Sequence, residues 1–502
     1  MSGEALFDVA IVGAGPAGMA AAVAAAESGR SVVLVDAGPQ PGGQYWRHPD
    51  ENDVPDADHS QHHDWAKYAK LQAQLQAQQS KGLVYIRNRQ VWSIAGNAST
   101  SFSLRLTPSR GGADTSVTLV NSRRIVLCPG GYDRQIPIPG WTLPGVMAAG
   151  GVQALLKGHQ TVAGKTAIVA GTGPFLLPVA TGLAKAGAKV VAICESSSPT
   201  KWLPNAGAAA ALPSKAIEGS QYAATLAKHR IPYKIRTVIT DIHGQEYVTG
   251  VTLGKVGKDG TIKSIPKTYD VDLVALGWGF SPSLELVVMV GAETRLDIDG
   301  SLVAEVDDMQ RSSVEGIFIA GEATGVGGAT LAVAEGQLAG ICAARSLSPG
   351  EEYLNSRTAK HLRKSIVRAR RFARAMHIAH PVPTNWTDWL EPSTTICRCE
   401  EVSYEDMCSA HDLLGAKDPR TMKLMARPGM GWCQGRVCGY AVAQVAAKLD
   451  GNRDPLEADL RSSSKRTLAA PVSLAVLAEL GTMQTAATTA PSAPNPVSSA
   501  EQ

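Results

Sequence analysis

One local pattern occurs twice in this sequence and constrains its fold more than any other feature. An apolar run, a glycine-rich turn, an alanine-rich segment and a second apolar run follow one another over residues 7–36, and the same order returns over residues 166–195. Short apolar runs bounded by turns are typical of buried parallel strands, and the segment after the glycines is typical of a helix. The sequence therefore predicts an α/β fold with two Rossmann-like βαβ units.

The first glycine turn has the spacing of a dinucleotide-binding site. Gly13, Gly15 and Gly18 form a G-x-G-x-x-G pattern, and Asp36 ends the following apolar run. Glycines permit a tight turn and close approach of the backbone to a pyrophosphate, whose charge the helix N-terminus meets, while the acid accepts hydrogen bonds from a ribose. Because strand, helix and terminal acid are all present, the motif predicts a bound dinucleotide rather than an ordinary glycine-rich loop.

The second glycine turn departs from this pattern. Gly171 and Gly173 are followed by Leu176 where a third glycine normally lets helix and strand pack closely. Glu195 ends the next apolar run, and the serines at 196–198 offer no arginine for a 2′-phosphate, which disfavours NADP. Two interpretations stay open: a second nucleotide site, and a purely structural Rossmann unit.

Four of the eight cysteines gather in two short stretches near the C-terminus, Cys397-x-Cys399 and Cys433-x4-Cys438. Four thiolates are the ligand set of a [2Fe-2S] cluster, and residues i and i+2 of an extended segment project to the same side. A structural zinc site is the alternative, although its cysteine pairs usually have spacers of two to four residues. A site without metal is the third interpretation.

The other cysteines indicate no redox dithiol. Cys128, Cys194, Cys342 and Cys408 lie in apolar segments, where cysteine is usually a small buried hydrophobe. The N-terminal half contains no Cys-x-x-Cys or Cys-x4-Cys pair, so a disulfide-reductase mechanism is not supported. The sequence also shows no Ser/His/Asp signature and no metal-spaced histidines, and we assign no catalytic residue.

Composition excludes several function classes. Lys and Arg number 48 against 45 Asp and Glu, and a net charge of +3 is too small for the cationic surface that nucleic-acid binding needs. The sequence contains no uninterrupted run of 18 or more apolar residues, so it predicts no membrane span. The N-terminus lacks the basic region of a signal peptide. We therefore expect a cytoplasmic protein, with peripheral attachment to the inner membrane left open.

The order of these motifs is similar to that of flavoproteins with two dinucleotide-binding domains, in which the first binds FAD and the second, inserted in it, usually takes a nicotinamide nucleotide. Pro41-Gly42-Gly43-Gln44 lies where that family's chain passes the flavin, and residues 128–134 stand at its crossover. Residues 319–322 look like its late Ala-Gly-Asp motif, followed by a helix whose N-terminus points at the flavin. The resemblance adds these residues to the FAD site: Gly43, Gln44, Gly321, Glu322 and Thr330.

The two cysteine stretches limit the resemblance to a smaller group of these flavoproteins. They are similar to the ferredoxin-like module of bacterioferritin-associated ferredoxin. The whole chain resembles the alpha subunits of heteromeric opine (octopine or nopaline) oxidases, D-hydroxyproline dehydrogenase, hydrogen cyanide synthase and hetero-oligomeric L-proline dehydrogenases. In that family a separate beta subunit, similar to D-amino-acid and glycine oxidases, binds its own FAD and oxidises a C–N bond.

The resemblance implies an electron-transfer subunit that carries FAD and a [2Fe-2S] cluster and passes electrons to a quinone or other acceptor. It implies a partner beta subunit and leaves open a small third subunit, a second nucleotide (NAD, ATP or ADP) and an FMN at a subunit interface. Two alternatives also stay open: a self-sufficient NADH-dependent oxidoreductase, and a subunit whose nucleotides and cluster are structural.

We expect five segments along the chain. A discontinuous FAD domain takes residues 1–150 and 270–350, a second nucleotide domain 151–269, a basic connector 351–393, the four-cysteine domain 394–465, and a tail 466–502 that is disordered after about residue 482. Within the connector, residues 358–376 predict an amphipathic helix with seven cations. Its cationic face is either solvated or a docking face for an acidic partner.

Overall fold

The structure is a computed structural model, and it describes residues 5–51, 54, 62, 64–109, 118–205, 207, 213–257, 260–348 and 356–478. The predicted disorder after about residue 482 lies outside the described residues. Both predicted βαβ units are confirmed, each with its two strands parallel in its own sheet. Within the described residues, no helix combines the length and apolar character needed to cross a membrane.

The first sheet is built around the first glycine motif. β1 pairs in parallel with β2 and with β6, and the strand order is β3-β2-β1-β6-β5-β4, with β19 also paired to β6. The sheet strands are β1 (Leu6–Val12), β2 (Val32–Val35), β3 (Val84–Ile86), β4 (Arg89–Gly96), β5 (Phe102–Pro108), β6 (Thr118–Leu127) and β19 (Ile317–Ile319). β19 follows the second domain along the chain, so the first domain is discontinuous in sequence.

Two helices cover one face of this sheet with their backbones nearly touching. α1 (Pro16–Glu27) follows the first glycine turn, and α8 (Ala329–Arg345) follows the late glycine motif. A Cβ atom added at Gly336 would lie 2.0 Å from the carbonyl oxygen of Ala17, and one at Gly340 would lie 2.2 Å from that of Ala21. Small residues on both helices therefore permit this approach, which brings the late motif beside the first turn. α2 (Trp65–Gln79) packs on the other side of α1.

The second sheet is entirely parallel, in the order β11-β10-β9-β15-β8. Its strands are β8 (Val146–Ala148), β9 (Thr166–Gly171), β10 (Lys189–Glu195), β11 (Tyr233–Ile235) and β15 (Leu273–Gly277), and its helices are α3 (Ala149–His159), α4 (Leu176–Lys185) and α6 (Pro213–Lys228), with the short helix η1 (Pro199–Asn205). β8 and β15 belong to this sheet although the expected segments placed residues 146–150 and 270–277 in the first domain. Hydrogen bonding to β9 and β15 continues the sheet beyond the local βαβ pattern.

An antiparallel sheet of three strands extends the second domain, and a pair of short strands connects the two domains. The sheet contains β12 (Thr237–Gly244), β13 (Val248–Val256) and β14 (Ile262–Asp270). β7 (Gly131–Asp133) pairs with β16 (Phe280–Pro282) where the chain crosses between domains in both directions. The remaining elements of this region are α7 (Glu285–Met289), β17 (Thr294–Leu296), β18 (Leu302–Ala304) and η2 (Gly321–Thr324).

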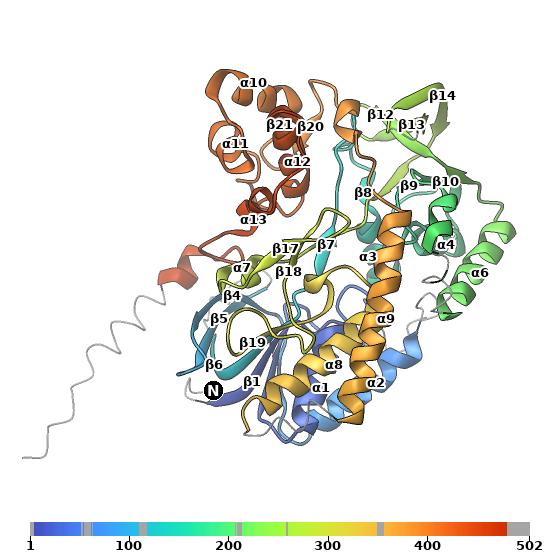
Figure 1. The fold of residues 1–502 in the computed structure, drawn as a ribbon. Helices are drawn as coiled ribbons and strands as arrows, with labels where there is room; N and C mark the ends of the chain where they lie inside the picture. Colours follow the sequence, from blue (N-terminus) through green and yellow to red (C-terminus); the bar gives the residue numbers. More distant parts are fainter. Residues whose placement is uncertain are drawn as a thin grey trace, which may run out of the picture.

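The helix predicted over residues 358–376 is α9 (Arg357–Ala379), and Ser356 caps it. Leu362 and Ile366 of its apolar face are buried in the core shared with α1 and α8. Figure 1 shows α9 running lengthwise beside α8 and on towards the second domain. The connector helix is therefore packed along one side of the domain built on the first sheet, which we call the flavin-type domain.

The cysteine region forms a small unit of short helices at one end of the molecule (Figure 1). It contains η4 (Trp386–Trp389), the strand pair β20 (Thr395–Cys397) and β21 (Val402–Ser403), and helices α10 (Tyr404–Leu414), α11 (Pro419–Ala426), α12 (Gly439–Leu449) and α13 (Glu457–Ser464). The Ser403 hydroxyl accepts from the amide of Asp406, and the Asp406 carboxylate accepts from the amide of Ser403, which completes a capping box at the start of α10. This cap fixes α10 directly after the first cysteine pair.

Candidate functional site

The first glycine turn is closed towards the protein and open on one side. A Cβ atom at Gly13 would lie 2.3 Å from the carbonyl oxygen of Cys128, and one at Gly18 would lie 1.6 Å from that of Gly13, so neither position tolerates a side chain. Gly15 differs, because the nearest heavy atom to its Cβ position is the Cα of Gly43 at 4.0 Å. Gly15 is also the N-cap of α1 and offers no side-chain cap. The amide end of α1 is therefore available to an anion beside Gly15.

Asp36 lies at the end of β2 beside this turn. Its carboxylate accepts hydrogen bonds from the amides of Ala14 and Gly38, each at 2.9 Å. Burial raises the pKa of Asp36, and those backbone hydrogen bonds oppose the rise. Gly43 completes the turn, because its Cβ position lies 2.8 Å from the Cα of Gly15. The structure thus brings Gly13, Gly15, Asp36 and Gly43 together, with Gln44 exposed next to them.

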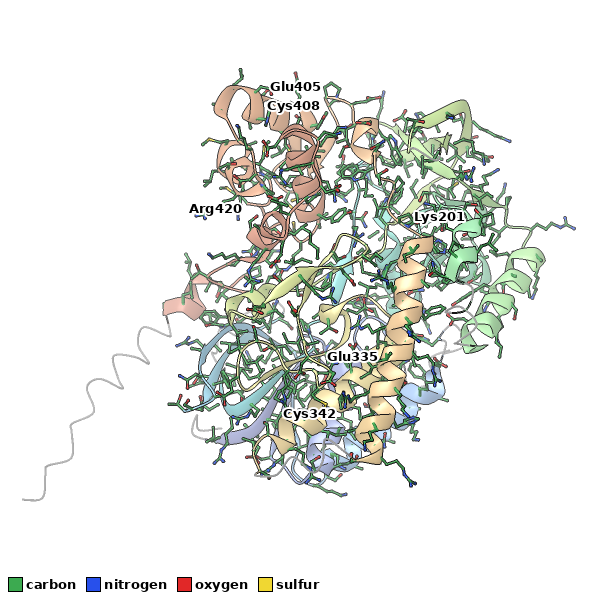
Figure 2. All side chains as sticks on the ribbon, in the orientation of Figure 1. Lys201, Glu335, Cys342, Glu405, Cys408 and Arg420 are labelled. Carbon is green, nitrogen blue, oxygen red and sulfur yellow. The ribbon has the colours of Figure 1, made fainter. Side chains whose placement is uncertain are left out.

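The late glycine motif is held beside α1 by a buried acid that the sequence prediction missed. Gly321 donates its amide to Glu335 Oε2 at 3.0 Å, and the Thr324 hydroxyl donates to the same oxygen at 3.0 Å. Glu335 is 1% exposed and lies in the interior between α8 and α9 (Figure 2). Arg370 of α9 pairs with its other oxygen, with Nη2 2.5 Å from Oε1. Burial raises the pKa of Glu335, and Arg370 opposes the rise.

Glu322 lies in the same motif but makes fewer contacts. Its carboxylate accepts from the amide of Gly328 at 3.3 Å, and burial raises its pKa to about 7. Gly328 caps α8 without a side-chain hydrogen bond, so the amides around Thr330 are open to a ligand.

The sequence held one signal for the buried acid Glu335. It is a lone acid in the otherwise apolar run of α8, and an acid at such a position needs a partner.

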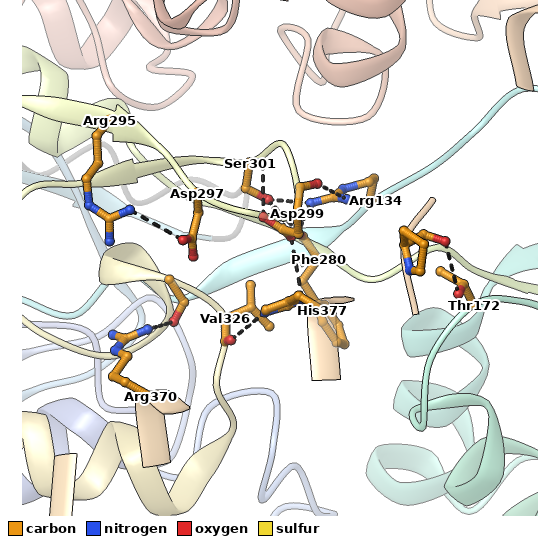
Figure 3. Close-up of polar contacts among 12 residues, drawn as sticks. Arg134, Thr172, Phe280, Arg295, Asp297, Asp299, Ser301, Val326, Arg370 and His377 are labelled. Atoms are coloured by element: carbon orange, nitrogen blue, oxygen red, sulfur yellow. Dashed lines mark hydrogen bonds and ion pairs between the residues drawn. The ribbon is translucent and has the colours of Figure 1, made fainter. Parts of the chain in front are cut away.

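α9 contacts this region again in its last turn. His377 Nε2 lies 2.9 Å from the carbonyl oxygen of Val326, and its Nδ1 lies 3.9 Å from Asp299 (Figure 3). Asp299 in turn pairs with the buried guanidinium of Arg134 at 2.7 Å. Part of the polar side of α9 therefore points into the protein, and Arg370 and His377 are not solvated connector residues.

The second glycine turn is closed towards the protein, as the first is. A Cβ atom at Gly171 would lie 1.8 Å from the carbonyl oxygen of Gly277, and Leu176 at the third-glycine position is fully buried. Glu195 is 0% exposed and accepts from the amides of Gly173 and Ser197, each at 2.9 Å. His380, which follows α9, pairs with Glu195 at 3.2 Å. The structure thus brings Gly171, Gly173 and Glu195 together, under a residue of the connector.

The four C-terminal cysteines meet in the small helical unit. The Cys438 thiol contacts Cys397 Sγ at 3.7 Å, and the amide of Gly429 donates to Cys397 Sγ at 3.3 Å. Cys433 contacts both Cys438 and Cys399, so the four sulfurs form a chain of neighbouring pairs. The hydrogen bond from Cys438 lowers the pKa of Cys397 to about 6 and that of Cys433 to about 5. Cys399, at the end of the chain of sulfurs, is exposed.

The thiols and the amide of Gly429 offer donors to a metal group. Among the residues that the structure describes, no group of three or more His, Cys, Asp or Glu is arranged to hold a metal ion. A [2Fe-2S] cluster needs two thiolates on each of two irons and accepts hydrogen bonds from nearby amides. A Cβ atom at Gly431 would lie 2.4 Å from the Cβ of Cys399, so glycine permits the loop to fold closely around this thiol.

The remaining cysteines lie apart from one another as free thiols. Cys128, Cys194 and Cys342 are buried, and burial raises the pKa of Cys194 and of Cys342 to about 12. Cys128 lies behind Gly13 without a second thiol beside it in the part of the chain that the structure describes. The thiol pair of a disulfide reductase is therefore not formed by these residues.

An arginine inside the second cysteine stretch joins this unit to the flavin-type domain. Arg436 lies between Cys433 and Cys438, and its Nε is 2.9 Å from both the Tyr132 hydroxyl and Glu285 Oε1. Its Nη2 donates to the carbonyl oxygen of Ala469 at 2.6 Å. Tyr132 lies on β7, where the first domain crosses to the second. No local pattern predicted this link, because its partners are far apart along the chain.

Comparisons with known proteins find a family model and relatives that match most of this chain. A family model described as pyridine nucleotide-disulphide oxidoreductase matches residues 7–337. The A subunit of opine oxidase from Agrobacterium tumefaciens (strain Ach5) is 31% identical over 485 residues, covering 94% of this chain and 92% of the relative. Its counterpart in the opine oxidase of Rhizobium meliloti is 30% identical, covering 94% and 88%.

Two further proteins are similar over most of the chain. Hydrogen cyanide synthase subunit HcnB of Pseudomonas protegens is 29% identical over 435 residues, covering 86% of this chain and 90% of the relative. The crystal structure of L-proline dehydrogenase from P. horikoshii matches with a TM-score of 0.63 at 18% identity, covering 94% of this chain and 79% of that chain. At this identity, the likeness shows that the two chains share a fold.

Proposed function

Since this chain belongs to the family of opine oxidase A subunits, we propose that it is the electron-transferring alpha subunit of a heteromeric FAD-dependent dehydrogenase. The substrate is an opine such as octopine or nopaline, or a related imino acid such as D-hydroxyproline or proline, oxidised at its C–N bond. The oxidation takes place on a partner beta subunit with its own FAD, similar to D-amino-acid and glycine oxidases. A quinone or similar acceptor receives the electrons.

FAD fits the first glycine turn. The open side of Gly15 and the uncapped end of α1 leave room and amide donors for a pyrophosphate, and Asp36 lies where a ribose would be. Glu322 and Thr330, at the uncapped start of α8, would meet the flavin end. The residues that we assign to FAD are Gly13, Gly15, Gly18, Asp36, Gly43, Gln44, Gly321, Glu322 and Thr330.

A [2Fe-2S] cluster fits the four C-terminal thiols. Cys397, Cys399, Cys433 and Cys438 supply the donor set, and the amide of Gly429 already donates to one sulfur. When bound, FAD takes up electrons in pairs, and the cluster passes them on singly. The protein's own part is to hold both groups at a fixed separation and to keep water away from the buried sulfurs of Cys397 and Cys438.

The observation that carries the proposal is the contact between the cysteine unit and the flavin-type domain. Arg436 belongs to the cysteine loop and Tyr132 to the crossover strand of the flavin-type domain, and they are hydrogen-bonded at 2.9 Å. The cysteine unit is thus docked against the domain that would carry FAD. A chain that only binds nucleotides has no need of four thiols at such a junction.

The test compares the chain alone with the chain plus its beta subunit. We expect the purified chain to contain flavin, about two irons and two acid-labile sulfides, and to oxidise no opine by itself. Adding octopine, nopaline or proline together with the beta subunit should bleach the flavin of this chain and reduce an artificial quinone. Full substrate oxidation by the chain alone, or a complex whose flavin here stays oxidised, would contradict the proposal.

A further inference from the structure

The second Rossmann unit contains the residues of a nucleotide site, but its acid is already fully engaged. In a nucleotide site the acid that ends the second strand accepts hydrogen bonds from the ribose. Here Glu195 Oε1 accepts from the Thr172 hydroxyl at 3.0 Å and from the Ser197 amide, and Oε2 accepts from the Gly173 amide. Oε2 also contacts His380 at 3.2 Å and the Tyr233 hydroxyl at 3.4 Å.

The first Rossmann unit serves as an internal comparison. Asp36 occupies the same position as Glu195 and accepts from the corresponding backbone region, at Ala14 and Gly38. Among the described residues, no side chain of this protein donates to Asp36 in the way that His380 and Tyr233 contact Glu195. The two acids therefore share their backbone contacts and differ in the side chains that cover them.

His380 is held in one orientation over Glu195. The indole N–H of Trp202 can only donate, and it lies 3.0 Å from His380 Nε2. Nε2 must then accept, which leaves the proton of the neutral ring on Nδ1, facing Glu195 and the Ser197 hydroxyl at 3.1 Å. Burial alone would raise the pKa of Glu195, but the hydrogen bond from His380, with the amide hydrogen bonds, brings it below its ordinary value.

The backbone after α9 covers the glycine turn as well. The Thr172 hydroxyl also lies 3.4 Å from the carbonyl oxygen of Pro381 (Figure 3). The Cβ of His380 is the nearest atom to the open side of Gly173, at 4.0 Å from its Cβ position. Imidazole and backbone thus stand over the turn and over its acid at the same time.

α9 is anchored so that this covering segment stays in place. Arg370 pairs with the buried Glu335, and His377 contacts the carbonyl oxygen of Val326, both within the flavin-type domain. Trp202 and Phe372 also lie with their ring centres 5.8 Å apart, which joins α9 to η1. Turning His380 away from Glu195 would also break its hydrogen bond with Trp202.

We infer that the second Rossmann site is filled by the chain itself, with His380 and Pro381 in the place of the adenosine ribose, and that it takes neither a nicotinamide nor an adenine nucleotide. The residues present therefore do not fit the nucleotide that the description of the matched family implies. The second domain acts as a support that fixes the far end of α9. This inference does not depend on the proposed substrate, beta subunit or cluster.

The first experiment is a titration of the flavin-loaded full chain with NADH, and separately with ADP, followed by nucleotide fluorescence and calorimetry. We expect no saturable binding at concentrations up to about 1 mM and no bleaching of the flavin by NADH. Binding of either probe in the micromolar range would overturn the inference. That result would leave the electron-transfer proposal standing, because opine-dependent reduction is measured separately.

The second experiment uses hydrogen exchange to test whether His380 fills the second Rossmann site. His380→Ala should speed exchange at the amides of Gly173 and Ser197, which both donate to Glu195, by about tenfold or more. His361→Ala is the matched control, since His361 is an exposed histidine of the same helix and should leave both amides unchanged. Unchanged protection in His380→Ala would show that His380 does not hold the site and would overturn the assignment.

Discussion

Arg436 and Tyr132 are hydrogen-bonded across the junction between the cysteine unit and the flavin-type domain, with Nε 2.9 Å from the tyrosine hydroxyl. Glu285 Oε1 lies at the same distance from that nitrogen, so the one Nε–H is shared between a neutral and a charged acceptor. Burial would lower the pKa of Arg436, but Glu285 and Tyr132 raise it above its ordinary value. The guanidinium is therefore a charged link between the two parts.

Arg436→Met should loosen this junction. The substitution keeps much of the side-chain length but leaves the carboxylate of Glu285 buried without its partner, which we expect to cost about 3 kcal/mol of unfolding free energy. Chemical denaturation measures that cost, and limited proteolysis should release the cysteine unit sooner. Arg420→Met removes an exposed arginine on the outer side of the same unit (Figure 2) and should change neither. Equal stability of the two variants would argue against the link.

Gly15→Val should release FAD without unfolding the chain. The Cβ position of Gly15 meets its nearest heavy atom only at 4.0 Å, and its φ of −72° suits any residue, so the flavin-free protein can accept a side chain there. The same side chain would stand where the pyrophosphate approaches the backbone. Flavin absorbance per chain measures the loss. Gly219→Val, at an open position of α6, should keep its flavin, and a Gly15→Val protein with full flavin would refute the assignment.

Arg370→Met should destabilise the late glycine motif. Glu335 would remain buried without its cation, at a cost of about 3 kcal/mol in unfolding free energy. Arg368→Met, at an exposed position on the same helix, is the control. The double variant Arg370→Met with Glu335→Gln should recover part of the loss, because no unpaired charge then remains. If the double variant is as unstable as the sum of both changes, the two side chains do not act as a pair.

The contrast between these sites shows what sequence reasoning could reach. The first turn and Asp36 were predictable because they form a local pattern with a defined spacing. The contacts of Arg370 with Glu335 and of Arg436 with Tyr132 were not, because they join residues distant in the chain and depend on how helices and domains pack. His380 was missed for the same reason, since nothing near it in sequence points to Glu195.

Glu322 should make stability depend on pH in the flavin-free chain. Burial raises its pKa from 4.5 to about 7, so between these values the folded state binds more protons than the unfolded state. The free energy of unfolding contributed by this group therefore falls as pH rises from about 4.5 to about 7 and is level above that. Glu322→Gln should remove this slope, and Glu305→Gln, at an exposed carboxylate, should retain it. If the free energy of unfolding changes with pH in the same way in the wild type and in Glu322→Gln, the raised pKa of Glu322 is contradicted.

Cys433→Ser should abolish cluster binding, whereas Cys408→Ser should not. Cys433 contacts both Cys438 and Cys399, and its loss leaves three thiolates where two irons need four, so one iron lacks a ligand. Cys408 lies on α10 of the same unit, apart from the chain of sulfurs (Figure 2), and controls for the loss of any one thiol.

Iron, acid-labile sulfide and flavin are measured together on the same sample of each variant. We expect Cys433→Ser to lose most of its iron and sulfide while keeping flavin, because the first glycine turn does not involve the cysteine loop. Equal iron in both variants would refute the ligand assignment. Zinc without sulfide in the unaltered chain would instead favour a structural metal site, because zinc needs four thiolates but no inorganic sulfur.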